Sequence, residues 1–153
     1  MCALSIFAPT IPDTIPRSKF IRIAQATKDI CQKYNIPVLI NDRIDVALAV
    51  GADGVHIGQT DMPIDVARRL LPPNAIIGMT CNTVDHVKQA IKDRVDYVGL
   101  GPVWPTQTKK VSSPVVGVRG IGELLEVLES SPEGQGVRAV SIGMYPRIMF
   151  DAA

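Results

Sequence analysis

Several features that would place the chain in a specialised class are absent from its 153 residues. It has three cysteines, an odd number, and no two of them form a C-x-x-C pair. This argues against a disulfide framework and a structural zinc site, and it is typical of a reducing compartment. No apolar run approaches the roughly 20 residues that a membrane span needs. The first residues also lack the basic region of a signal peptide, so we expect a cytoplasmic protein.

The chain also has little net charge and none of the common nucleotide or hydrolase motifs. Its net charge of +1 predicts no general attraction for nucleic acid or for a membrane. There is no Walker sequence, no G-x-G-x-x-G and no Ser-His-Asp arrangement. Any binding of anions must therefore come from local geometry.

What the sequence does have is a repeated pattern of short runs rich in β-branched residues, separated by helix-prone stretches. The runs start at intervals of about twenty residues, as buried parallel strands do in repeated β-α units. The predicted strands are 36–40, 54–57, 75–79, 95–100 and 137–142. The predicted helices are 18–35, 45–52, 63–73, 83–94 and 121–130.

This alternation indicates an α/β fold with a parallel sheet and crossover helices. Such short and regular repeats favour a (β/α) barrel over an open doubly wound sheet, although a complete barrel needs on the order of 250 residues. We therefore expect a partial TIM (β/α)8 barrel of about five parallel strands. Its predicted parts are an irregular segment at 1–17, the partial barrel at 18–143 and a divergent tail at 144–153.

Local signals refine the predicted helices. Gly51 should end the second helix, Pro63 should occupy the first position of the third, and Thr83 should cap the fourth. Two helices carry apolar stripes at helical spacing. The predicted stripes are Phe20, Ile23, Ile30 and Tyr34 in the first helix, and Val84, Val87 and Ile91 in the fourth.

The positions after each strand are the candidates for a functional site, because the carboxyl ends of parallel strands converge there. Asn41 and Asp42 follow the first strand, and Asp61 follows the second. Two carboxylates after neighbouring strands can share one Mg²⁺ ion. Each aspartate alone could equally cap the helix that follows it, but the pair at equivalent positions favours metal binding.

Later strands end in residues suited to phosphate. Thr80 offers a hydroxyl after the third strand, although capping is the favoured role for this residue taken alone. The loop after the fourth strand, GPVWPTQTKK at 101–110, combines glycine, two prolines, alternating hydroxyls and lysine, and is more specific than a solvated loop requires. Gly143 follows the fifth strand and can give its N–H to a phosphate. We expect His56 to be a satisfied interior histidine and His86 to be solvated.

Four segments taken in order carry a resemblance: PVLINDRIDVALAVGADGVHIGQTDMP, IIGMT, DYVGLGPVWPTQTKK and VSIG. They resemble thiamine phosphate synthase, over a stretch from about Phe20 to Gly143. The segment KKVSSPVVGVRGI looks most like the synthase half of the fungal enzyme fused to hydroxyethylthiazole kinase.

The resemblance implies a barrel enzyme that joins hydroxymethylpyrimidine diphosphate to thiazole phosphate, giving thiamine phosphate and diphosphate. It implies Mg²⁺ as the cofactor, bound by Asp42 and Asp61, and small phosphate compounds as partners. Asn41, which would hold the pyrimidine, and Lys109, which would hold the diphosphate, would be the catalytic residues. The remaining substrate-binding residues implied by the match are Thr80, Thr106, Gln107, Thr108 and Gly143.

Parts of the family pattern are missing from this sequence. No two strands precede the first helix, so a basic strand motif for diphosphate is absent, and Met144 stands where the family has a glycine pair. We therefore expect the chain alone to be weakly active or inactive. The alternatives are a non-catalytic fragment that pairs its open edges with a second copy or another chain, and a thiazole tautomerase relative. The NDR, GQTD and PTQTK segments together favour the synthase over the tautomerase.

Overall fold

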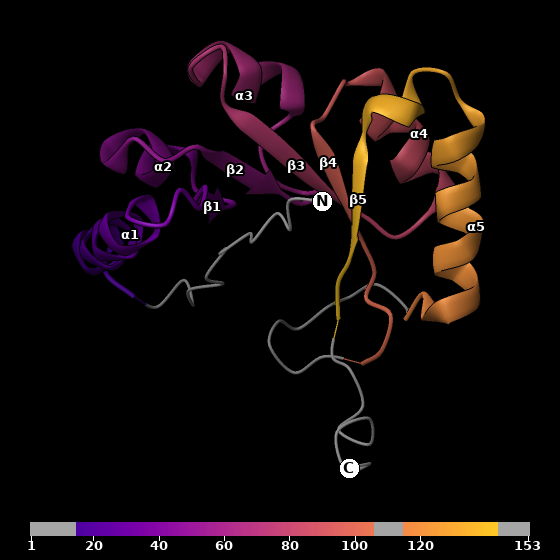
Figure 1. The fold of residues 1–153 in the computed structure, drawn as a ribbon, viewed down its shortest axis with the longest axis horizontal. Coiled ribbons are helices and arrows are strands. Elements are labelled where there is room, and N and C mark those ends of the chain that lie inside the picture. Colours follow the sequence, from indigo (N-terminus) through magenta and orange to yellow (C-terminus); the bar gives the residue numbers. More distant parts are fainter. Residues whose placement is uncertain (1–14, 106–114, 144–153) are drawn as a thin grey trace. The chain divides into compact units, whose positions relative to one another are not determined.

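The computed structural model describes residues 15–105 and 115–143 (Figure 1). The predicted tail at 144–153 and most of the predicted irregular segment at 1–17 lie outside this range. The described helices are α1 (Arg17–Gln32), α2 (Ile44–Val50), α3 (Ile64–Leu70), α4 (Val84–Lys92), α5 (Gly117–Ser130) and the 3-10 turn η1 (Gly134–Gly136). The described strands are β1 (Leu39–Asn41), β2 (Gly54–Ile57), β3 (Ile76–Cys81), β4 (Tyr97–Leu100) and β5 (Arg138–Ser141).

The five strands follow one another in the sheet in chain order, β1-β2-β3-β4-β5. The β1–β2 and β4–β5 pairs are parallel, as the alternation of strands and helices predicts. The chain divides into two compact units, Met1–Gly78 and Met79–Ala153, and each has its own buried apolar residues.

In the first unit, α1 lies beside α2 (Figure 1). The face of α1 that packs inward carries Phe20 and Ala24, which are 5% and 1% exposed. The predicted stripe is wrong for its other members, because Ile23, Ile30 and Tyr34 are all exposed. The spacing of seven residues puts Ile23 and Ile30 on a flank of the helix beside the buried face, whereas Tyr34 lies beyond the end of α1.

The ends of the helices in this unit follow mostly from local chemistry. Gly51 adopts a left-handed conformation with φ of 59° and ends α2, as predicted. Pro63 occupies the N-cap position of α3, not the first helical position, which corrects the prediction by one residue. A proline fits there because the N–H it lacks has no partner within the helix.

Two polar side chains form hydrogen bonds with backbone atoms near the amino ends of the strands in the first unit. Lys28 on α1 donates from Nζ to the carbonyl oxygen of Val50, at 2.9 Å, where α2 ends. Asp53, just before β2, accepts from the N–H of Val38 with its Oδ2 atom, at 2.8 Å. Because each bond joins different elements, the helices and strands of this unit are tied together at that end.

In the second unit, α4 and α5 lie side by side (Figure 1). Thr83 caps α4 as predicted, since its hydroxyl accepts from the N–H of His86 at 3.2 Å. The buried residues of α4 are Val87 and Ala90, so the predicted stripe is wrong at Val84, which is exposed. Alanine at position 90 lets the helix approach its neighbours closely, a feature that a search for large apolar residues overlooks.

Candidate active site

The first unit brings Asn41 and Asp42 to the carboxyl end of β1. Asn41 pairs in register with His56 of β2, and the N–H of Asp42 donates to the carbonyl oxygen of His56 at 2.9 Å. Asp42 has a φ of 60°, in the left-handed region that L residues rarely adopt. Strained residues of this kind cluster at functional sites, which agrees with the candidate role of Asp42.

Asp61 is held close to the carboxyl end of β2. Its Oδ2 atom accepts from the N–H of Gly58 at 2.7 Å, and its own N–H donates to the carbonyl oxygen of Gly58 at 3.3 Å. The alternative role of Asp61 as a helix cap is wrong, because Pro63 is the N-cap residue of α3 and no side chain caps it. The carboxylate is instead fixed to the loop directly after β2.

An ion-pair network that the sequence interpretation missed lies beside Asp42. The guanidinium of Arg43 binds both carboxylate oxygens of Asp45, with Nε to Oδ1 at 2.8 Å and Nη2 to Oδ2 at 2.5 Å. Arg17 Nε lies 3.4 Å from Asp45 Oδ2. The hydrogen bond from Arg43 is the main reason why the pKa of Asp45 is lowered. Opposite charges two residues apart are too common in sequences to have signalled this pair.

The donor atoms of the first unit fit Mg²⁺. Among the described residues, no group of three or more His, Cys, Asp or Glu could hold a metal ion. Mg²⁺ does not need such a cage, because it is usually bound through one or two carboxylates together with waters and substrate phosphates. Asp42 and Asp61 are both half-buried and follow neighbouring strands, so they supply that kind of donor set.

In the second unit, Thr80 and Cys81 form the end of β3. Thr80 does not cap a helix, as the alternative role required, because it lies within the strand and Thr83 caps α4. Its half-buried side chain lies one residue before the strand end. Cys81 is completely buried, and burial raises the pKa of its thiol to about 12. Cys81 is therefore an inert interior thiol and not a reactive group of the site.

Two glycines allow the loop after β4 to pack against the end of β5. Gly101 has a φ of 157° and precedes a cis peptide bond to Pro102. A Cβ atom at Gly101 would lie 2.3 Å from the carbonyl oxygen of Ile142, and one at Gly143 would lie 2.8 Å from the backbone nitrogen of Val103. Gly143 therefore has a structural reason to be glycine, in addition to its predicted phosphate contact.

Other candidate residues are placed differently. Thr106, Gln107, Thr108 and Lys109 lie outside the described residues, so their roles stay predictions. His56 lies in β2, half-buried and with an interaction partner, which agrees with an interior histidine. His86 was expected to be solvated, but its Nδ1 atom is buried and has no hydrogen-bond partner in the described structure.

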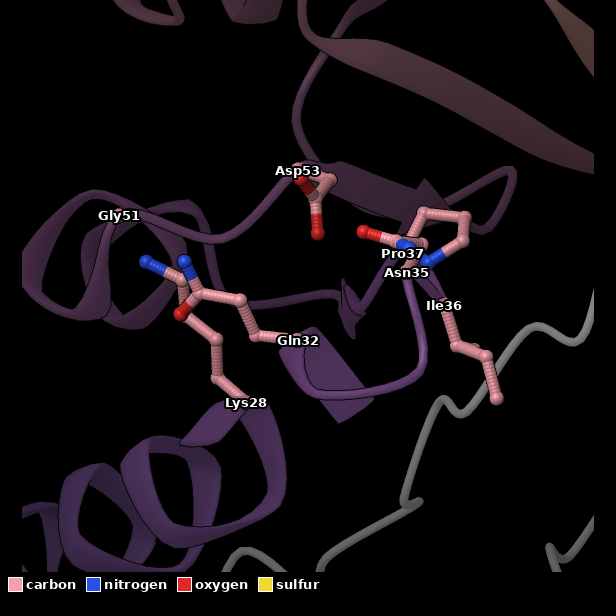
Figure 2. A pocket seen from close by; sticks show the side chains of 7 residues that line it. All are labelled: Lys28, Gln32, Asn35, Ile36, Pro37, Gly51 and Asp53. Atoms are coloured by element: carbon pink, nitrogen blue, oxygen red, sulfur yellow. The ribbon is translucent and has the colours of Figure 1, made fainter. Parts of the chain in front are cut away.

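A hollow of about 390 Å³ opens at the other end of β1 and β2 (Figure 2). It lies at the amino ends of the strands, because residues 35–37 precede β1 and residues 51–53 precede β2. Two of its polar side chains, Lys28 and Asp53, bind backbone atoms there. The hollow is thus separate from the strand ends that carry Asn41, Asp42 and Asp61.

Within residues 15–105 and 115–143, no helix has the length and apolar character needed to cross a membrane.

Comparison with known proteins gives a consistent result. The family model for thiamine monophosphate synthase matches residues 12–143. The thiamine-phosphate synthase of Clostridium tetani is 35% identical over 147 residues, covering 84% of this chain and 70% of that protein. The probable thiamine biosynthetic bifunctional enzyme of Schizosaccharomyces pombe is 50% identical over 107 residues, covering 70% of this chain and 21% of that protein.

A solved structure, thiamine phosphate pyrophosphorylase from Pyrococcus furiosus, is similar with a TM-score of 0.71 and 33% identity, covering 87% of this chain and 59% of that chain. The parallel strands, their crossover helices and this similarity confirm the predicted class, a partial TIM-barrel α/β protein. The chain belongs to the thiamine monophosphate synthase family. It spans about a fifth of the length of the Schizosaccharomyces pombe relative and somewhat more than half of the Pyrococcus furiosus structure.

Proposed function

We propose that the protein acts in thiamine biosynthesis as a thiamine phosphate synthase, a transferase that joins hydroxymethylpyrimidine diphosphate to thiazole phosphate. The products are thiamine phosphate and diphosphate. The observation that carries this proposal is the pair of aspartates after β1 and β2, in a chain that the family model matches over residues 12–143. Asp61 accepts a hydrogen bond from the N–H of Gly58, and Asp42 has a left-handed backbone conformation with φ of 60°.

Asp42 and Asp61 would be the protein ligands of Mg²⁺ in this reaction. Mg²⁺, when bound, supplies positive charge that offsets the negative charge of the departing diphosphate. Gly58 would orient Asp61, because its N–H occupies Oδ2 and leaves Oδ1 without a partner among the described residues. This arrangement supports binding of a cation through Oδ1 without loss of the existing hydrogen bond.

Asn41 would hold the pyrimidine substrate through its side-chain amide, which can donate and accept hydrogen bonds. Its backbone is fixed by the register of β1 with β2, so the side chain starts from a rigid element. Lys109 would stabilise the charge that develops on the leaving diphosphate, and the electron-rich pyrimidine would tolerate the resulting carbocation. The thiazole nitrogen would then attack, so the reaction needs no side-chain nucleophile.

In the second unit, Thr80 would contact the pyrimidine side, and Thr106, Gln107, Thr108 and Gly143 would hold the thiazole phosphate. The chemistry of these groups supports the assignment, since hydroxyls, amides and backbone N–H groups are ordinary phosphate donors. The cytoplasm stays the predicted compartment, and pairing of the sheet edges with a second copy stays a prediction that the molecular mass in solution would test.

Two measurements test the proposed function. Calorimetry should detect binding of hydroxymethylpyrimidine diphosphate that requires Mg²⁺, and Asp42→Asn and Asp61→Asn should each weaken it by roughly tenfold or more. A coupled assay with both substrates should detect diphosphate release only when Mg²⁺ is present, and at the weak rate expected for this chain. If the chain bound the diphosphate equally well with and without Mg²⁺, and both variants behaved as the unmodified protein, the assignment would be refuted.

A further inference from the structure

The backbone at the end of β1 is held in an unfavourable conformation. The N–H of Arg43 donates to the carbonyl oxygen of Asn41 at 2.7 Å, which closes a three-residue turn around Asp42. At the centre of this turn Asp42 has a φ of 60°. Aspartate tolerates this region better than most residues, but the conformation still persists only where the surroundings enforce it.

Both flanks of the turn are anchored by backbone bonds. On the strand side, the N–H of Asp42 donates to the carbonyl oxygen of His56 in β2. On the helix side, the carbonyl oxygen of Arg43 accepts from the N–H of Ala47 at 3.0 Å, in the first turn of α2. These bonds fix where the chain enters and leaves the turn.

The side chain of Arg43 adds a second anchor on the helix side. Its two bonds to the Asp45 carboxylate have the paired geometry that a guanidinium provides and a lysine cannot. Asp45 lies in the first turn of α2 and also faces Arg17 of α1. The residue that follows Asp42 is therefore bound to the helix through its backbone and through its side chain.

We propose that Arg43 and Asp45 are positioning residues whose paired hydrogen bonds hold Asp42 in its strained turn and so orient the Asp42 carboxylate toward a divalent cation. This inference rests on the proposed role of Asp42 as a metal ligand. The Arg43 and Asp45 side chains are 36% and 47% exposed, and ion pairs so exposed add little to global stability. Loss of the pair should therefore change the conformation of Asp42 and lower the melting temperature only slightly.

Two variants of Arg43 separate orientation from charge. Arg43→Lys keeps the positive charge but cannot form both bonds, whereas Arg43→Gln loses the bonds and the charge. If Arg43 acted only through its charge, Arg43→Gln would strengthen cation binding, because a repulsive charge is removed. If Arg43 instead acts by orienting Asp42, Arg43→Gln should weaken cation binding. Both variants should then bind Mn²⁺ roughly tenfold more weakly or worse, as loss of a supporting partner typically produces.

Mn²⁺ binding can be measured by electron paramagnetic resonance of the free ion, with inorganic diphosphate present. A matched control is available in α3, where Arg69 forms an exposed ion pair with Asp65 at 3.6 Å in the same unit. Arg69→Lys and Arg69→Gln change charge and pairing in the same way. They should leave Mn²⁺ affinity unchanged, because among the described residues Arg69 pairs with Asp65 and not with the turn at Asp42.

Amide hydrogen exchange measured by nuclear magnetic resonance provides a readout that does not need the metal. The N–H groups of Asp42 and Arg43 should exchange about tenfold faster or more in both Arg43 variants, and not in the Arg69 variants. If the unmodified chain bound no Mn²⁺, the proposed function would fail, and the exchange rates would still decide this inference. Tighter Mn²⁺ binding by Arg43→Gln, or unchanged exchange at both amides, would overturn it.

Discussion

Replacing Gly58 by alanine should displace the carboxylate of Asp61 while leaving the fold intact. A Cβ atom at Gly58 would lie 2.7 Å from Oδ2 of Asp61, whereas ordinary contact begins at 3.4 Å. The oxygen must therefore retreat by about 0.7 Å. The hydrogen bond from the Gly58 N–H, now 2.7 Å long, must therefore bend or lengthen, because the same oxygen accepts it.

The expected magnitudes differ for stability and for metal binding. Only the end of one side chain has to move, so the stability loss should be close to that of one hydrogen bond to a charged group, about 1.5–3 kcal/mol at most. Metal affinity should fall by roughly tenfold, equivalent to about 1.4 kcal/mol, because the carboxylate no longer has its fixed orientation.

The assay is a Mn²⁺ titration with inorganic diphosphate present, together with thermal unfolding of the same samples. Gly122→Ala is the control, because Gly122 lies in α5 and, apart from its chain neighbours and its own helix backbone, no atom of the described residues lies within 4 Å of the new methyl group. This variant should gain up to about 1 kcal/mol of stability. Unchanged Mn²⁺ affinity in Gly58→Ala, at a lowered melting temperature, would show that Asp61 does not bind the metal.

Three further predictions concern contacts within each unit: a close backbone contact, a helix cap and a buried thiol. Gly54→Ala should cost about 3 kcal/mol or more in urea unfolding, since its Cβ would lie within 2 Å of the backbone oxygen of Ile76; an unchanged midpoint would contradict this packing. Thr83→Ala should lose about 1 kcal/mol and Thr83→Ser almost nothing, and equal losses would exclude the capping bond. At pH 8, iodoacetamide should label Cys31 well before Cys81, because the raised pKa of Cys81 keeps its buried thiol protonated; equal labelling rates in the folded protein would contradict its burial.

The parts of the fold that were predicted correctly depend on local signals. The bounds of β2 coincide with the predicted run at 54–57, and Gly51 and Thr83 end and begin helices as expected. In each case the deciding chemistry lies within a few residues: a β-branched run, a left-handed glycine, a hydroxyl that reaches the next turn. Such signals do not depend on which partner the segment meets.

The parts that failed depend on contacts between distant residues. Ile23 and Ile30 lie at helical spacing from Phe20, yet the packing of α1 buries Phe20 and Ala24 and leaves both isoleucines exposed. The candidate aspartates were found from their positions after strands. Their geometry could not be predicted from the sequence, because the turn at Asp42 depends on His56 and on Arg43. The pairing of Arg43 with Asp45 has no distinctive sequence pattern.

The crossing of the β4 loop with the end of β5 has a consequence for how the sequence can change. The N–H of Val103 donates to the carbonyl oxygen of Ile142, and Gly101 and Gly143 each lie within a methyl group's reach of the other segment's backbone. Substitutions at the two glycines would push the same pair of backbones apart, so their effects on stability should not add. Once one glycine is lost and the segments have separated, a substitution at the second should cost less than it would alone, although the positive φ at both positions still disfavours any other residue.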